Sequence, residues 1–122
     1  MKVLIIDDER DVRDIARLSL VRLGSMEVSE AENGQEGLGK ALAERPDAIL
    51  LDVVMPLMDG PSTLAALRRN PATAGIPVIF LTGRGSRQDA VELAELGAAG
   101  IVPKPFNPMT LPAQVREILA RR

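Results

Sequence analysis

Hydrophobic residues along the chain follow two spacings in turn. Short runs of apolar, largely branched residues predict five strands, at residues 2–6, 26–31, 48–53, 78–81 and 100–102. Between them, apolar residues recur every three or four positions and predict helices near 12–23, 38–42, 61–70, 90–96 and 108–121. Because strands and helices alternate, we predict an α/β fold, with a parallel five-stranded sheet covered by helices on both faces.

One carboxylate, Asp52, interrupts the apolar run 49–56. An isolated charge inside a buried strand is costly, so we expect Asp52 at the strand's carboxyl end, where it opens into a crevice. The pair Asp59-Gly60 and the neighbouring prolines indicate that the chain turns soon after Asp52. In open α/β sheets, ligands bind at this edge.

Composition narrows the chemistry available there. The 122 residues, 46% of them apolar, are enough for one domain over 1–122 with its own core, and we expect no output domain. The chain has no cysteine, and without histidine it lacks the commonest general base and transition-metal ligand. Any site must therefore use carboxylates, hydroxyls, Lys, Arg and the backbone.

The charge balance excludes several kinds of partner. A net charge of −2 gives no basic patch for nucleic acid, and two aromatic residues give no stacking surface for single strands. The apolar runs are too short to span a bilayer, and Met1 leads directly into a strand and not into a signal peptide. We therefore expect a cytoplasmic protein that binds neither nucleic acid nor membrane directly.

Four of the predicted strands end in polar groups, namely Asp7 with Asp8, Asp52, Thr82 and Lys104. Parallel strands bring their carboxyl ends to one edge, so these groups should converge there. Crowded carboxylates raise one another's pKa, and Mg²⁺, which prefers oxygen ligands, would relieve the repulsion. A metal, a lysine and a hydroxyl around a carboxylate suit a phosphoryl group, which the carboxylate could accept as an aspartyl phosphate.

Each of these residues also has a purely structural interpretation. Asp7 and Asp8 could cap the following helix, and Asp52 could be a strand-end turn residue. Thr82 could bond nearby backbone, and Lys104 could be a solvated surface charge. Only their convergence at one edge favours a functional site.

Four segments together resemble the receiver domain of CheY-like response regulators in two-component signalling. Their order and separations agree with that family over essentially the whole chain: 4–9 (LIIDDE), 51–60 (LDVVMPLMDG), 80–83 (FLTG) and 104–106 (KPF). The resemblance implies a flavodoxin-like doubly wound (βα)5 fold with strand order 2-1-3-4-5. It also implies a cis bond between Lys104 and Pro105.

The resemblance further assigns roles at the strand ends. It implies that Asp52 is the phospho-acceptor and that Asp8 binds Mg²⁺ directly. Asp7 would bind the ion through water or share that role, and the backbone carbonyl of Val54 would be a further ligand.

Thr82 and Lys104 would contact the phosphoryl oxygens. The implied phosphoryl donor is a sensor histidine kinase or a phosphotransfer protein. The implied protein target binds the face of the fourth helix, fifth strand and fifth helix, and we expect a monomer or weak dimer. We expect no enzymatic activity beyond the domain's own phosphoryl transfer and the hydrolysis of its aspartyl phosphate.

Ile101 departs from the family pattern. The family usually has an aromatic residue three positions before the lysine, and a stiff β-branched side chain has no ring to turn inward. Either Thr82 acts through backbone shifts in the Gly83–Gly85 connector, or phosphorylation alters the target face only slightly. We favour the first because of the two glycines.

The sequence allows two other functions. A pseudo-receiver could bind partners constitutively without phosphoryl chemistry, and the absence of an aromatic residue at Ile101 supports this alternative. A Mg²⁺-dependent phosphohydrolase is disfavoured, because Val54 stands where a second aspartate would serve as general acid.

The helix around 38–42 carries Gly37 and Gly39, each of which costs about 1 kcal/mol relative to Ala in a helix interior. We therefore predict that this helix is the least rigid of the five.

Overall fold

The computed structural model describes residues 1–83 and 87–121, and for residues 87–89 it describes the backbone alone. Its strands are β1 (Lys2–Ile6), β2 (Glu27–Ala31), β3 (Ala48–Asp52), β4 (Val78–Thr82) and β5 (Gly100–Pro103). Its helices are α1 (Arg10–Arg22), α2 (Gly34–Glu44), α3 (Gly60–Arg69), α4 (Arg87–Glu95) and α5 (Leu111–Ala120).

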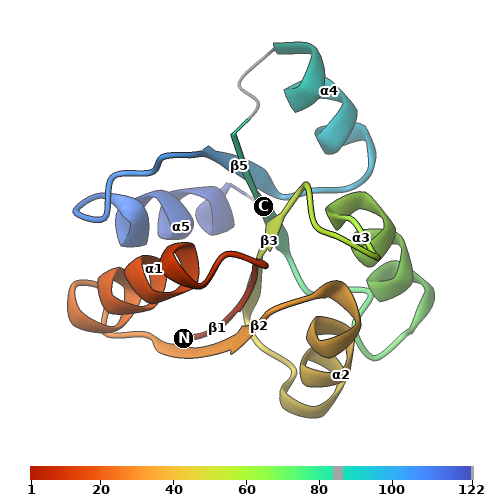
Figure 1. Ribbon diagram of the computed structural model, residues 1–122, viewed down its shortest axis with the longest axis horizontal. Coiled ribbons are helices and arrows are strands. Elements are labelled where there is room, and N and C mark those ends of the chain that lie inside the picture. The colour runs from red at the N-terminus through yellow and green to blue at the C-terminus, as the bar shows by residue number, and fades with distance from the viewer. Residues whose placement is uncertain (84–86, 122) are drawn as a thin grey trace.

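The five strands form one parallel sheet in the order β2-β1-β3-β4-β5 (Figure 1). This order confirms the predicted doubly wound α/β fold. The strands β1 and β3 lie side by side near the centre, so the direction of the chain connections reverses between them. That reversal point is where ligands bind in folds of this kind.

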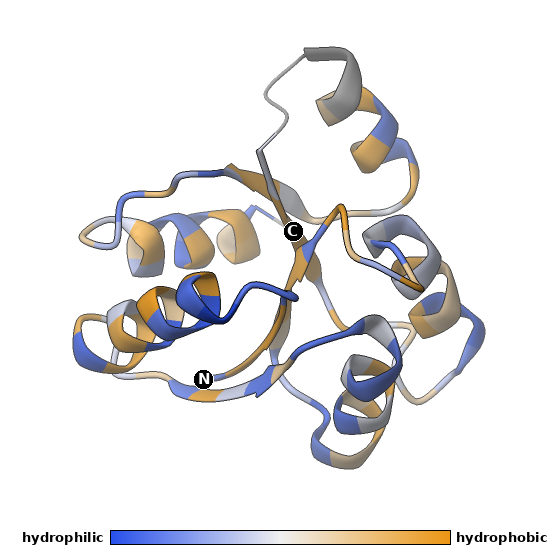
Figure 2. Cartoon of the chain, viewed as in Figure 1, coloured by the Kyte–Doolittle hydropathy of each residue, from blue (hydrophilic) through white to orange (hydrophobic). Residues whose placement is uncertain are grey.

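Alternate strand residues point to opposite faces of the sheet and build two cores. Along each labelled helix, hydrophobic and hydrophilic residues are mixed (Figure 2). One core joins the sheet to α1 and α5 and includes Ile5, Leu50, Leu20, Val115 and Ile118. The other joins it to α2, α3 and α4 and includes Ile6, Leu51, Phe80, Leu64 and Leu93. β3 and β4 are buried along their whole length, as their continuous apolar sequences predict.

Two helices begin at other residues than predicted, and local hydrogen bonds explain both differences. The Asn33 side chain accepts a bond from the Glu36 N–H at 2.8 Å, so Asn33 caps α2, which begins at Gly34 and not near residue 38. The last helix begins at Leu111, not at residue 108. The N–H groups of Thr110 and Leu111 both donate to the Asn107 carbonyl in a turn before it.

Gly37 and Gly60 allow close packing near the carboxyl edge of the sheet. A Cβ at Gly37 would lie 2.4 Å from the Ile6 side chain, so this glycine lets α2 approach β1. A Cβ at Gly60 would lie 2.3 Å from the Asp52 carbonyl oxygen. Gly39, by contrast, faces open space. The rigidity of α2 stays a prediction, but Gly37 has a packing role that the sequence did not reveal.

The Lys104–Pro105 bond is cis, as predicted. The proposed relay through the 83–85 connector falls mostly on residues 84–86, which lie outside the described part of the chain. Within the described residues, no helix has the length and apolar character needed to cross a bilayer.

Candidate functional site

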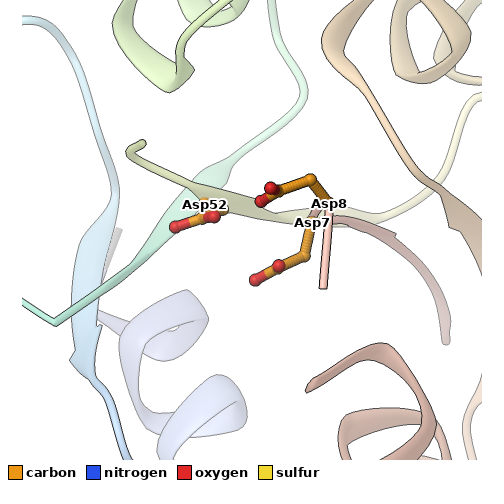
Figure 3. A group of neighbouring side chains, drawn as sticks. All are labelled: Asp7, Asp8 and Asp52. Atoms are coloured by element: carbon orange, nitrogen blue, oxygen red, sulfur yellow. The ribbon is translucent and has the colours of Figure 1, made fainter. Parts of the chain in front are cut away.

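Three aspartates meet at the carboxyl edge of the sheet (Figure 3). Asp7 and Asp8 directly follow β1, and Asp52 is the last residue of β3. The pairing of Ile6 with Leu51 brings the ends of the two strands to the same level. One carboxylate oxygen from each aspartate lies within 4.8 Å of the others. The predicted convergence of these acids is therefore present.

Asp7 and Asp8 differ sharply in environment. Asp7 is fully buried, and its N–H donates to the Ala31 carbonyl at 3.1 Å. Its carboxylate accepts bonds from the Glu9 N–H at 2.8 Å and from Lys104 Nζ at 2.7 Å. Asp8 is exposed. Of the two acids, Asp8 is therefore the one whose carboxylate faces solvent.

Lys104 bridges the two buried carboxylates. Its ammonium lies 2.7 Å from Asp7 Oδ2 and 3.1 Å from Asp52 Oδ1, and its side chain is 15% exposed. The backbone N–H of Lys104 donates to the Thr82 carbonyl at 2.7 Å, which ties the residue to the end of β4. A single cation thus reaches across the edge of the sheet from β5 to β1 and β3.

The electrostatics of the site follow from this crowding. Burial is the main reason that the pKa of Asp52 rises to about 6, the charge of Asp7 adds to the rise, and Lys104 opposes it. Burial disfavours the charged form of Lys104, but its hydrogen bond to Asp7 and the charges of Asp7 and Asp52 outweigh this and raise its pKa. At neutral pH, Asp52 is therefore mostly ionised and Lys104 is protonated.

Thr82 ends β4 and is buried, one residue beyond the Asp52–Leu81 pair in the sheet register. It lines a cavity of about 460 Å³ with Val53, Val54, Met55, Asp59, Pro61, Glu92, Leu93 and Leu96. This cavity lies between α4 and the loop after β3. Thr82 and Val54 therefore border one hollow, and Val54 is 61% exposed.

The donor set fits a hard divalent cation. Three carboxylates whose oxygens can converge within 4.8 Å repel one another unless a positive charge compensates. Mg²⁺ takes oxygen ligands, commonly one or two carboxylates together with water. Burial and the charge of Asp7 raise the pKa of Asp52 although Lys104 opposes the rise, and a bound cation would oppose it further.

The structure brings Asp7, Asp8, Asp52 and Lys104 together, and it places Thr82 at the end of the neighbouring strand. The metal role of the Val54 carbonyl stays a prediction. Sequence reasoning did not identify the Glu9 backbone as a partner of Asp7. An acid that is followed by a helix start could have suggested it, because such a carboxylate often accepts a bond from the N–H two residues on.

Comparison with known proteins agrees with this geometry. A family model described as "Response regulator receiver domain" matches residues 3–116. The transcriptional regulatory protein CpxR of Escherichia coli K12 is 42% identical over 120 residues, covering 98% of this chain and 50% of that protein. The phosphate regulon transcriptional regulatory protein PhoB of Pseudomonas aeruginosa is 35% identical over 119 residues, covering 98% of this chain and 52% of that protein. The chain thus spans about half the length of these curated relatives.

Solved structures show the same similarity. The chemotaxis response regulator CheY4 of Vibrio cholerae has a TM-score of 0.89 at 36% identity, covering 96% of this chain and 97% of that one. A putative response regulator from Chloroflexus aurantiacus has a TM-score of 0.88 at 34% identity, covering 98% of both chains. This chain belongs to the response regulator receiver domain family of two-component systems.

Proposed function

We propose that the protein is a phosphorylation-controlled switch in which Asp52 accepts a phosphoryl group in a Mg²⁺-dependent reaction. The donor is a sensor histidine kinase or a histidine phosphotransfer protein, so we expect the protein in the cytoplasm. The observation that carries the proposal is the position of Asp52, a buried strand-end carboxylate 3.1 Å from Lys104 and beside Asp7 and Asp8.

The transfer requires little more than a correctly placed nucleophile. A carboxylate oxygen of Asp52 attacks phosphorus, a P–O bond forms, and the P–N bond of the donor phosphohistidine breaks. The electron pair of that bond stays on the departing imidazole nitrogen, and the donor leaves as neutral histidine because its other ring nitrogen carries a proton. Since the pKa of Asp52 is about 6, most of the nucleophile is ionised at neutral pH.

Charge compensation is the other requirement. Asp8, Asp52 and the carbonyl of Val54 would hold Mg²⁺, with Asp7 bound through water or sharing the role. The ion would supply positive charge against the phosphoryl oxygens as they approach. Lys104 already lies 3.1 Å from Asp52 and would shift its contact from the carboxylates to the new phosphoryl group. Thr82 would donate its hydroxyl to the same group.

The proposed output is a change in how a protein target binds α4, β5 and α5. Val91 and Leu96, in and just after α4, are about half exposed and offer apolar contact area. Ile101 pairs with Phe80 in the sheet and packs against the core beneath α4. Since Ile101 has no ring to turn inward, we propose that Thr82 acts through the backbone of the 83–85 connector.

Acetyl phosphate provides a direct test without any protein donor. With Mg²⁺ present, the wild-type protein should gain the mass of one phosphoryl group, and Asp52→Asn should gain none. Asp59→Asn is a matched control, because Asp59 lies in the loop after β3, outside the three-aspartate cluster, and its side chain caps α3, where Asn caps equally well. This control should gain the same mass as the wild type.

Other results would change the assignment. The absence of an adduct on the wild type would contradict the switch and favour a constitutive binding module. Continuous phosphate release from an added phosphomonoester, abolished by Asp52→Asn, would indicate a phosphohydrolase. We propose that the protein catalyses only its own phosphoryl transfer and the hydrolysis of its aspartyl phosphate.

A further inference from the structure

We propose that Arg13 is a positioning residue for the magnesium site, which it orders by fixing the peptide between Asp7 and Asp8. The proposal rests on the proposed Mg²⁺ binding and extends it to a residue outside the acidic cluster. Arg13 would not touch the metal or the phosphoryl group. It would act on the direction in which the chain leaves β1.

Arg13 joins three elements of the fold. It lies near the start of α1, and its Nη1 donates to the carbonyl oxygen of Asp7 at 2.8 Å. Its Nε donates to the carboxylate of Glu30, on the edge strand β2, at 3.3 Å. The Arg13 side chain is 13% exposed. The planar guanidinium can make both contacts at once because its donors point in fixed, different directions.

The Asp7 carbonyl belongs to the peptide group that leads into Asp8. On the other side of Asp7, the N–H donates to the Ala31 carbonyl on β2. With both of these backbone groups held, the chain has little freedom to rotate where Asp8 begins. Asp8 is exposed, and its carboxylate lies within 4.8 Å of those of Asp7 and Asp52. We infer that the two hydrogen bonds of the Asp7 backbone help to hold Asp8 in this orientation.

Electrostatics alone would predict the opposite role for Arg13. A guanidinium so close to a cation site repels Mg²⁺, so a variant that only lost this charge should bind the ion more tightly. A variant that lost the hydrogen bond from Arg13 to the Asp7 carbonyl should bind Mg²⁺ more weakly. The sign of the change in Mg²⁺ affinity therefore separates the two explanations.

Arg17 is a matched control for this comparison. Its Nε lies 2.9 Å from the second carboxylate oxygen of Glu30, so it pairs with the same acid as Arg13. Its side chain is 44% exposed. Within the described residues, its one ion pair is with Glu30, and it makes no hydrogen bond to Asp7. Removing Arg17 therefore removes a similar charge and a similar ion pair while leaving the Asp7 carbonyl bonded.

The experiment measures the Kd for Mg²⁺ by isothermal titration calorimetry on the wild type, Arg13→Met, Arg13→Lys and Arg17→Met. Arg13→Met should weaken binding about tenfold, the lower end of the effect of losing a group that orients a metal ligand. Arg13→Lys keeps the charge but lacks the planar guanidinium that bonds both the Asp7 carbonyl and Glu30. It should therefore also bind Mg²⁺ more weakly than the wild type. Arg17→Met should bind as the wild type does or slightly more tightly.

Thermal unfolding in EDTA shows whether each variant folds, and if Arg13→Met does not, Arg13→Lys carries the test. Unchanged or tighter Mg²⁺ binding by the Arg13 variants would overturn the proposal, as would equal weakening in Arg17→Met. If the wild type itself bound no Mg²⁺, the proposed function would fail first. The two failures are therefore distinguishable.

Discussion

The helix α4 is held to the sheet by fewer buried contacts than α1 and α5 on the opposite face. On one face, each helix is bonded to the segment beside the other: Ser19 Oγ in α1 donates to the Pro108 carbonyl before α5 at 2.5 Å, and Arg116 in α5 donates to the Gly24 carbonyl after α1. On the other face, α4 buries only Leu93 among its described side chains, residues 90–95. The cavity beside Thr82 lies under this weakly packed helix.

This difference matches the two requirements of the proposed switch. Asp7 and Lys104, which fix the geometry of the site, are joined to each other and to the backbone of β2 and β4. Thr82 lies between that fixed part and α4. Regions with few buried contacts open or shift at lower free-energy cost than the core, so a change at Thr82 should move α4 before it moves α1 or α5.

A matched pair of leucine truncations tests the difference in packing, and it has the largest expected effect. Leu20→Ala removes a fully buried side chain of α1 and should lower the free energy of unfolding by about 3–4 kcal/mol. Leu93→Ala should cost only about 2 kcal/mol, because α4 can settle into the space that is left. Urea unfolding measures both, and equal losses would show that α1 and α4 are equally well packed.

The stability contributed by Asp52 should depend on pH with a defined sign. Its pKa is about 6 in the folded protein against an ordinary value of 3.8, so the folded state holds the proton to higher pH. The contribution therefore favours folding at low pH and is lost as the pH rises from about 4 to about 6. After allowance for solvent screening at the open edge, the loss is about 1–2 kcal/mol.

Asp52→Asn isolates this contribution. Without Mg²⁺, the variant should be more stable than the wild type by about 1–2 kcal/mol at pH 7 and equally stable near pH 4. Saturating Mg²⁺ should remove its advantage, because the ion binds the ionised wild-type cluster. Urea unfolding across this pH range, with and without Mg²⁺, gives the comparison. An advantage that did not change with pH would show that Asp52 is not under electrostatic strain.

Two alanine substitutions in α2 should have effects of opposite sign. Gly37→Ala places a methyl group against Ile6 and should cost about 1–2 kcal/mol. Gly39→Ala meets open space and should stabilise the protein by about 0.5–1 kcal/mol through helix propensity. Thermal unfolding distinguishes them. A stabilising Gly37→Ala would mean that α2 does not pack closely on β1.

Much of the site was predictable because its polar residues stand at the ends of predicted strands. Asp52 and Lys104 each follow or end a short apolar run, and parallel strands bring such ends together whatever the side-chain details. The alternation of strands and helices predicted the α/β class, and the resemblance to receiver domains gave the strand order. These conclusions depend on local patterns that survive in a single sequence.

Contacts between distant residues were not predictable in the same way. The sequence gives no sign that Asp7 is buried and bonded while its neighbour Asp8 is exposed, because that difference depends on Lys104, 97 positions away. The link from Arg13 to Glu30 also joins separate elements. One signal was available: a cation near the start of a helix opposes the helix dipole, and so calls for a specific partner.

The most direct test of the central claim locates the phosphoryl group chemically. Borohydride reduces an aspartyl phosphate to homoserine, which peptide mass spectrometry assigns to a position. After treatment with acetyl phosphate and Mg²⁺, we predict homoserine at position 52 and at no other aspartate, and none when EDTA replaces Mg²⁺. Homoserine at another position, or an equal yield at position 52 in EDTA, would contradict the account.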